Sequence, residues 1–300
     1  MTHRPLAFYL NPRGPDRRKI MQTLAEAGVR LVGMDGTGWD PDRDRQEIDY
    51  FLRDLDAFGL GVQSMHGIPP LVARADADTP PDLIDALLRD LRRVAPFKGK
   101  TVVYHACWMR DIAPERFDQA IDAAGWLPFV ERNAKTLKLM AREAARHGLT
   151  VVLENIWHSR RAASIAWFIE IVRAAGEPNV GVCLDSGHAH LSGVDVAAQV
   201  RAAGKLLRDT HFHDNVGPIN GQLFDQHIPP GLGTINWQDV CRALNAIDFP
   251  GPVVFEGVLG PGDSIEQGRF GGELSHRDLI QITIANWRAA EALAVRPPPS

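Results

Sequence analysis

The chain has 300 residues, 45% hydrophobic and 23% charged, with a formal net charge of −4 at pH 7. These values are ordinary for a globular protein with a large core, and they argue against general attraction to nucleic acid or to an anionic membrane. The three cysteines, Cys107, Cys183 and Cys241, are odd in number and show no CxxC spacing, which favours a reducing compartment. No segment has the roughly 18 apolar residues of a membrane span or the pattern of a signal peptide, so we expect a cytoplasmic protein.

Short apolar runs alternate with amphipathic segments along the whole chain. The predicted strands are Leu6–Leu10, Val29–Asp35, Gly61–His66, Thr101–His105, Thr150–Glu154, Val180–Asp185, Asp209–His213 and Pro252–Glu256. The predicted helices are 16–27, 41–58, 80–95, 114–148 with a break near Gly125, 160–175, 192–205, 236–247 and 276–293.

Several predicted helices end in a glycine before the next strand, as at Gly28, Gly59 and Gly148, which is typical of αβ loops. Eight strand–helix units without a shift in composition predict an α/β protein, a single (β/α)₈ TIM barrel over residues 1–295, followed by a frayed tail at 296–300. A doubly wound sheet with a second domain is the alternative fold.

Potential metal ligands close many of the predicted strands. Glu154, Asp185 and Glu256 each follow an apolar run, and His66 and His105 end the third and fourth strands. On the seventh strand, the side chains of His211 and His213 share a face because strand side chains alternate with period two. In a barrel these strand ends meet at one mouth, where active sites of this fold lie.

A shared divalent cation is the simplest partner for several buried carboxylates. A single strand-end carboxylate is more often a helix cap or ion pair, and a single histidine is more often a hydrogen-bonding residue. Their combination on at least five strands indicates a metal site. The mixed oxygen and nitrogen donors suit Mn²⁺, Zn²⁺, Co²⁺ or Mg²⁺. Elsewhere, the segment 11–18 could bind a phosphate at a helix N-terminus, or could be an exposed charge run.

A set of motifs in fixed order resembles one protein family. The motifs are Ser64-Met-His-Gly67, Val103-Tyr-His105, Val152-Leu-Glu-Asn155, Cys183-Leu-Asp-Ser-Gly-His188, His211-Phe-His-Asp-Asn215, Asp225-Gln-His-Ile-Pro-Pro-Gly-Leu-Gly-Thr-Ile-Asn-Trp237 and Val254-Phe-Glu-Gly257. Together they resemble the xylose-isomerase-like TIM barrel superfamily of sugar isomerases and epimerases, which also contains the endonuclease IV class of DNA repair enzymes. The resemblance covers nearly the whole chain.

The resemblance implies a metal held by Glu154, Asp185, His211 and Glu256, with His188 contacting substrate. His213 would then lie nearer the rim, bonded to substrate, water or a loop carboxylate. The implied reaction is isomerisation or epimerisation of a small sugar or keto-polyol, or a related lyase reaction, by proton transfer next to a carbonyl through a metal-stabilised enediolate. Glu154 and Glu256 would act as acid and base. The sequence does not determine the oligomeric state, and a homo-oligomer is one alternative.

The endonuclease IV branch implies a different use of the same mouth. That branch holds three zinc ions, and this chain has a residue for every ligand, including His66, His105, Asp225 and His227 as additional metal or substrate ligands. The segment after Glu154 and the loop after the second strand lack the DNA-binding features of that branch, and the net charge is acidic. A three-zinc phosphodiesterase, or a non-catalytic metal-binding barrel, is therefore the alternative function, and we expect no nucleic-acid partner.

Overall fold

The computed structural model describes residues 3–36, 39–67, 75–105, 113, 116–157, 159–220, 222–259 and 274–295. The predicted tail at 296–300 and Cys107 lie outside these ranges. Eight parallel strands form one sheet in the order β7-β6-β5-β4-β3-β2-β1-β8. Their bounds are β1 (Leu6–Leu10), β2 (Leu31–Asp35), β3 (Gly61–His66), β4 (Thr101–His105), β5 (Thr150–Glu154), β6 (Val180–Asp185), β7 (Leu207–His211) and β8 (Val253–Phe255).

The sheet closes into a barrel between its two end strands. Phe212 and Phe255 form a parallel bridge between β7 and β8, and the Phe212 amide donates to the Val254 carbonyl at 2.8 Å. The Thr210 hydroxyl accepts from the Val254 amide at 2.9 Å, so a side chain supplies a contact that a regular ladder would supply from the backbone. The structure thus confirms the predicted (β/α)₈ barrel.

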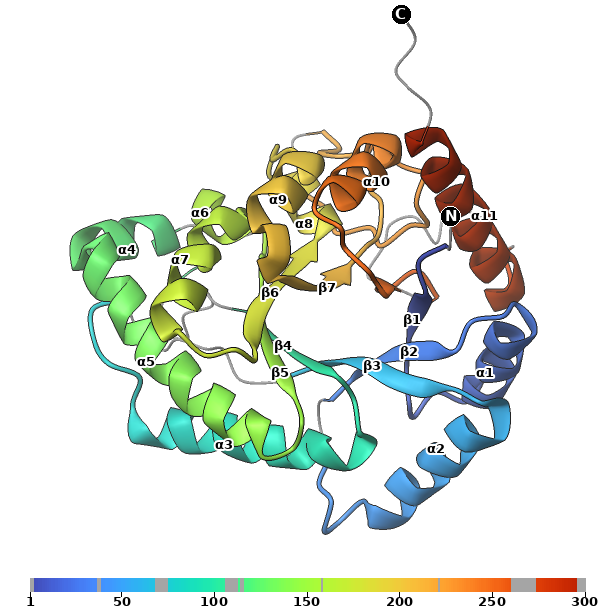
Figure 1. Cartoon of the computed structure of the whole chain (residues 1–300), viewed down its shortest axis with the longest axis horizontal. Coiled ribbons are helices and arrows are strands. Elements are labelled where there is room, and N and C mark those ends of the chain that lie inside the picture. The colour runs from blue at the N-terminus through green and yellow to red at the C-terminus, as the bar shows by residue number, and fades with distance from the viewer. Residues whose placement is uncertain are drawn as a thin grey trace, which may run out of the picture.

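Helices surround the strands, as Figure 1 shows. They are α1 (Arg17–Glu26), α2 (Arg45–Phe58), α3 (Pro81–Val94), α4 (Phe117–Ala124), α5 (Trp126–Ala145), α6 (Arg160–Ala163), α7 (Ile165–Ala175), α8 (Ser186–Leu191), α9 (Val196–Ala203), α10 (Trp237–Ala246) and α11 (His276–Ala294), with 3₁₀ turns at Ala95–Phe97 and Gly204–Leu206. Within the described ranges, no helix combines the length and the apolar character needed to cross a membrane.

Local chemistry explains where the elements differ from the predicted ones. The predicted break at Gly125 is confirmed, because this glycine adopts φ 84° between α4 and α5. Helix α8 was not predicted, since its sequence Ser-Gly-His-Ala-His-Leu has weak helix formers. It begins because the Asp185 side chain caps it, accepting from the His188 amide at 2.7 Å. Strand β7 begins and ends two residues earlier than predicted, because beyond His211 the chain leaves the ladder after one bridge to Phe255.

Two layers of apolar side chains hold the barrel. The larger lies between strands and helices, where Phe8, Phe255 and Trp287 are fully buried. The smaller is inside the barrel, where Val103, Val152 and Cys183 form a separate buried cluster. Each of these three precedes a strand-end polar residue by two positions and shares its face. The interior core therefore forms the floor beneath the mouth.

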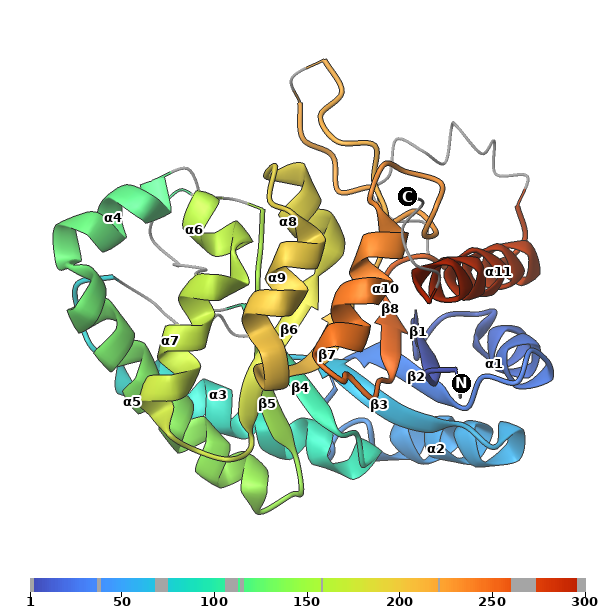
Figure 2. The same ribbon diagram turned by 45° about the horizontal axis from the view of Figure 1, so that its top comes forward.

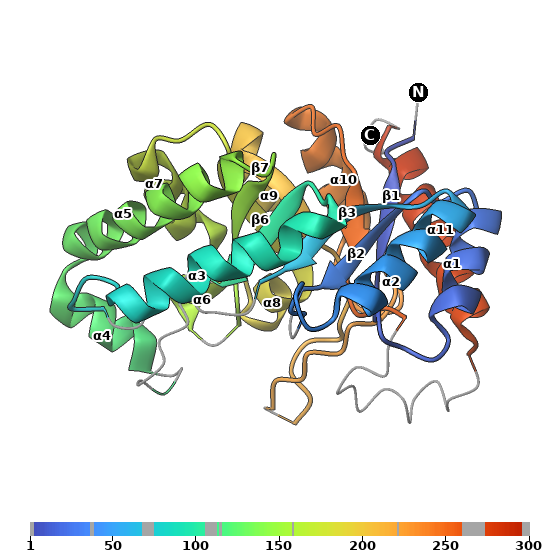
Figure 3. The ribbon, with the colours of Figure 1, turned by 90° about the horizontal axis from the view of Figure 1, so that it is seen from below.

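The segment between β7 and α10 projects beyond the carboxyl ends of the strands, as Figures 2 and 3 show. It carries Asp225 and His227 and turns back through the bridge between Asp214 and Ile228. Asp214 anchors its base: the carboxylate accepts from the Gly231 amide at 2.8 Å and from the Trp237 ring nitrogen at 2.7 Å. This buried anchor places the segment over the mouth.

Candidate functional site

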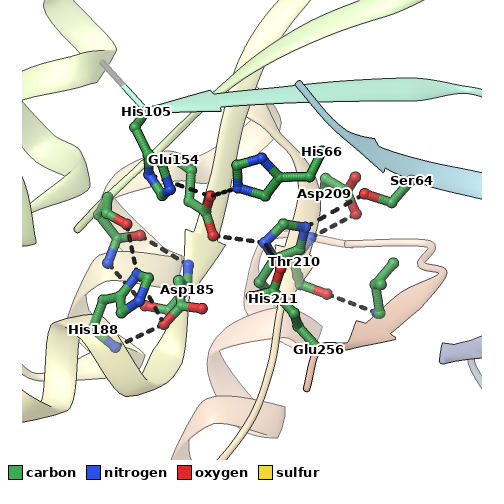
Figure 4. A network of polar contacts seen from close by, with 12 residues as sticks. Ser64, His66, His105, Glu154, Asp185, His188, Asp209, Thr210, His211 and Glu256 are labelled. Carbon is green, nitrogen blue, oxygen red and sulfur yellow. Dashed lines mark hydrogen bonds and ion pairs between the residues drawn. The ribbon is translucent and has the colours of Figure 1, made fainter. Parts of the chain in front are cut away.

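Four strand-end side chains meet at the centre of the mouth (Figure 4). Glu154, Asp185, His211 and Glu256 each offer one ligand atom, and these atoms all lie within 4.8 Å of one another. His211 Nδ1 lies 2.6 Å from Glu154 Oε1 and 3.2 Å from Glu256 Oε1. Glu154, Asp185 and His211 are fully buried, whereas the Glu256 side chain keeps 15% of its surface exposed. We name these four residues the central cluster.

Two further histidines lie against the other side of Glu154. His66 Nε2 is 3.2 Å and His105 Nδ1 is 3.4 Å from Glu154 Oε2. These three residues also bring their ligand atoms within 4.8 Å of one another. The structure therefore brings His66 and His105 to the mouth, as their positions at the ends of two strands predict.

A third group lies nearer the rim. The Nε2 atoms of His188 and His227 lie 3.0 and 2.8 Å from the same oxygen, Asp225 Oδ2. The other ring nitrogen of His188 donates to the Asn155 carbonyl at 2.9 Å. His188 thus connects β5 and α8 to the projecting segment.

His213 lies between the central cluster and the projecting segment. Its side chain is fully buried, and Nε2 is 3.0 Å from Asp185 Oδ2 but 3.7 Å from the loop carboxylate Asp225. Its ring stacks on His227 with centroids 3.8 Å apart. Gly187 makes this position possible, because a Cβ there would lie 2.0 Å from the His213 ring. His213 therefore contacts Asp185 of the central cluster and also approaches the loop carboxylate Asp225.

Sequence reasoning missed a buried polar group beneath His211. Asp209 is 1% exposed; it accepts from the Thr101 hydroxyl, from Ser64 and from the Thr210 amide at 2.8 Å. The Ser64 hydroxyl lies 3.4 Å from His211 Nε2, the ring nitrogen that faces away from Glu154. Burial raises the pKa of Asp209. The signal was the period-two spacing, since Asp209 precedes His211 by two positions and must share its face.

Opposite charges at the mouth offset the cost of burying the titratable groups there. Burial disfavours the charged form of His66, but the hydrogen bond and charge of Glu154 outweigh it and raise the His66 pKa to about 9. His227 behaves likewise with Asp225, and its pKa is also about 9. Burial raises the pKa of Glu256, yet His211 overcomes this and lowers it to about 2. A cation at the mouth would supply positive charge to the same carboxylates that now raise the pKa values of these histidines.

A cavity of about 1090 Å³ opens beside the central cluster. His66, His227 and Glu256 line its inner end, and the segment after β1 lines the far side. Glu256 is the member of the central cluster that lines this cavity, so a ligand there would meet this carboxylate first.

Comparison with known proteins adds to the geometry. D-psicose 3-epimerase of Agrobacterium fabrum is 27% identical over 181 residues, 59% of this chain and 56% of that protein. Inosose isomerase of Bacillus velezensis is 29% identical over 119 residues, 39% of this chain and 42% of that protein. The matched segments thus span about half the length of these relatives.

Solved structures show the same architecture. The crystal structure of an IOLI protein with a bound zinc atom matches with a TM-score of 0.69 and 17% identity, over 96% of this chain and 98% of that one. The family model described as xylose isomerase-like TIM barrel matches residues 21–269, most of the chain. The motifs, the barrel and this match agree, and the chain belongs to the xylose isomerase-like TIM barrel family.

Proposed function

We propose that Glu154, Asp185, His211 and Glu256 hold one divalent cation. Three carboxylates and an imidazole form a hard, mixed donor set that suits Mn²⁺, Zn²⁺, Co²⁺ or Mg²⁺. Their ligand atoms already lie within 4.8 Å of one another, and three of the four side chains are fully buried. Buried carboxylates are costly unless a positive charge accompanies them, which a cation at this point would provide.

We propose that the protein is a sugar or keto-polyol isomerase or epimerase. The observation that carries this proposal is the central cluster facing a large cavity through Glu256. The names of the relatives, an epimerase of a ketose and an isomerase of an inosose, support the substrate class. When bound, a divalent cation would offset negative charge on the substrate oxygens during proton transfer.

The side chains of the chain then have distinct roles. Glu256, which borders the cavity, takes a proton from the carbon next to the carbonyl. Glu154, at the end of β5, delivers a proton to the other face of the same carbon, and Glu256 then gives its proton to solvent. His188 orients a substrate oxygen through Nε2, which in the structure binds Asp225 at 3.0 Å. Asp225 would release this nitrogen when substrate enters.

Proton transfer at carbon has a direct test. In heavy water, the metal-loaded protein should introduce deuterium at one carbon next to the carbonyl of a ketose or keto-polyol. Glu154→Gln and Glu256→Gln should each lower this exchange by about 10²–10⁴-fold, because each removes a proton-transfer group. Nuclear magnetic resonance of a panel of such substrates measures it. Absence of exchange on every member would contradict the proposal.

One observation favours a second candidate, a three-zinc phosphodiesterase. His66, His105 and Glu154 form one group, and His213, Asp225 and His227 form another, each with its ligand atoms within 4.8 Å of one another, so side chains that could hold two additional ions are in place. Metal content separates the two functions. One ion per chain supports the isomerase, while three zinc ions together with cleavage of an abasic-site oligonucleotide would transfer the assignment to the phosphodiesterase.

Asp209 should tune metal binding without touching the metal. If His211 Nδ1 binds the cation, its Nε2 carries the proton and faces Ser64, which hydrogen-bonds Asp209. Loss of such support for a ligating histidine typically weakens metal binding by about 10–100-fold. We therefore expect Asp209→Asn to weaken binding by about this factor in a chelator competition assay, while the exposed control Asp42→Asn does not. Unchanged affinity in Asp209→Asn would show that the network serves packing alone.

A further inference from the structure

The cavity beside the central cluster extends well beyond the reacting position. From His66, His227 and Glu256 it runs to the segment between β1 and α1, to Trp39 and to His276. Its volume of about 1090 Å³ slightly exceeds the roughly 300–1,000 Å³ of pockets that take drug-sized ligands. A single sugar ring held at the central cluster would leave the far part of this space to solvent.

The arginines on the far wall are already paired. Arg13 Nη2 lies 2.8 Å from Asp44 and its Nε 3.2 Å from Glu47, and its guanidinium covers the Trp39 ring at 4.1 Å. Arg17 donates to the Pro12 carbonyl at 2.7 Å and to Asp54 at 2.5 Å. The phosphate site considered for residues 11–18 would draw on these cations as well as on the helix N-terminus, and carboxylates already neutralise both of them. The far wall therefore favours a ligand without a phosphate group.

Asp35 is the strand-end carboxylate that the central cluster does not use. It ends β2 and is paired in register with His66 across the parallel ladder, so both side chains point to the mouth. It lines the cavity and is exposed, and the described part of the chain offers it no hydrogen bond or ion pair. A carboxylate in this setting accepts hydrogen bonds from hydroxyl groups and repels anions.

We propose that the far part of the cavity binds the non-reacting portion of a neutral keto-sugar larger than one ring, a keto-glycoside or keto-disaccharide, with Asp35 accepting hydrogen bonds from its hydroxyl groups. This inference rests on the proposed proton transfer at the central cluster. The reacting ring lies against Glu256, and the second ring extends toward β1, β2 and Asp35. Binding energy from the second ring then positions the first for reaction.

The test compares matched substrates. Exchange rates are measured for a keto-disaccharide, for the keto-monosaccharide that corresponds to its reacting ring, and for a phosphorylated keto-monosaccharide. We expect kcat/KM to be at least about tenfold higher for the two-ring substrate than for either of the others, since hydrogen bonds to a charged group are among the stronger ones. Asp35→Ala should lower the ratio of two-ring to one-ring kcat/KM by about tenfold. Asp49→Ala, an exposed carboxylate on α2 outside the cavity, is the matched control and should leave the ratio unchanged.

Calorimetric binding of the reduced, alcohol forms separates this inference from the proposed function, because these ligands cannot exchange a proton at carbon. Tighter binding of the two-ring alcohol, weakened by Asp35→Ala, supports the second-ring site even if no substrate exchanges. Exchange on the monosaccharide with no preference for the second ring overturns the site and leaves the isomerase proposal standing. A preference for the phosphorylated sugar, or an unchanged ratio in Asp35→Ala, also overturns it.

Discussion

Glu256→Gln should lose about 10²–10⁴-fold in turnover, because one substitution removes both a cation ligand and the proposed base that faces the cavity. The amide has almost the same size, so the barrel should remain folded. The apolar layers that hold it, around Phe8, Phe255 and Trp287, do not involve this side chain. Metal content by mass spectrometry, deuterium exchange and circular dichroism together measure the effect.

The matched control is Glu131→Gln, which makes the same change on the exposed face of α5. It should keep full metal content and full exchange activity. If Glu256→Gln kept full metal content and full exchange activity, Glu256 would be neither a ligand nor a base. The metal site would then consist of the other three side chains of the central cluster.

Metal affinity should rise steeply between pH 7 and 9. In the metal-free protein, burial opposes the charged form of His66, but Glu154 raises its pKa to about 9, and the negative groups around buried His211 raise its pKa well above the usual value. A cation at the central cluster must displace such protons. Each displaced proton contributes about tenfold in affinity per pH unit. Competition titrations at pH 7, 8 and 9 measure the slope.

The stability of the metal-free protein should change in the opposite direction. The folded-state pKa values of His66 and His227 lie above the ordinary value of 6.5. Their stabilising contribution is complete below about 6.5 and is lost as the pH rises through about 9. Thermal unfolding without metal should therefore show a falling Tm over this range, and bound metal should suppress the fall. The surface control His147→Gln should show the same dependence of metal affinity on pH as the unchanged protein. If metal affinity did not change between pH 7 and 9, the protons of the mouth would not compete with the cation.

Much of the fold follows from local patterns. Apolar runs of about five residues and glycine-ended helices correctly predicted the eight strands and the closed architecture, and Gly125 marked the break between α4 and α5. Helix α8 was not predicted because its start depends on the Asp185 cap and not on the helix propensity of its residues. The end of β7 was misplaced because pairing with β8 decides where that strand stops, and β8 lies more than 40 residues away.

The candidate site divides in the same way. Strand-end positions and the period-two rule brought out Glu154, Asp185, His211 and Glu256 from the sequence, since any barrel directs such residues to one mouth. The sequence could not predict which other side chains contact these four residues. His213 was expected near the rim beside substrate, water or a loop carboxylate; its ring stacks on His227 and lies 3.7 Å from Asp225, and the absence of a side chain at Gly187 also admits it against Asp185.

The sequence by itself thus determined the kind of fold, the family and the residue types that meet at the mouth, because periodicity and chain order are local properties that survive without coordinates. Only the tertiary structure decided which atoms face each other. It placed Asp209 and Ser64 behind His211, and paired Arg13 and Arg17 with carboxylates from and near α2. It also left Asp35 facing the cavity without a partner among the described residues. Hydrogen bonds and ion pairs act over a few ångströms between segments far apart in the chain, so closure of the barrel is what selects them.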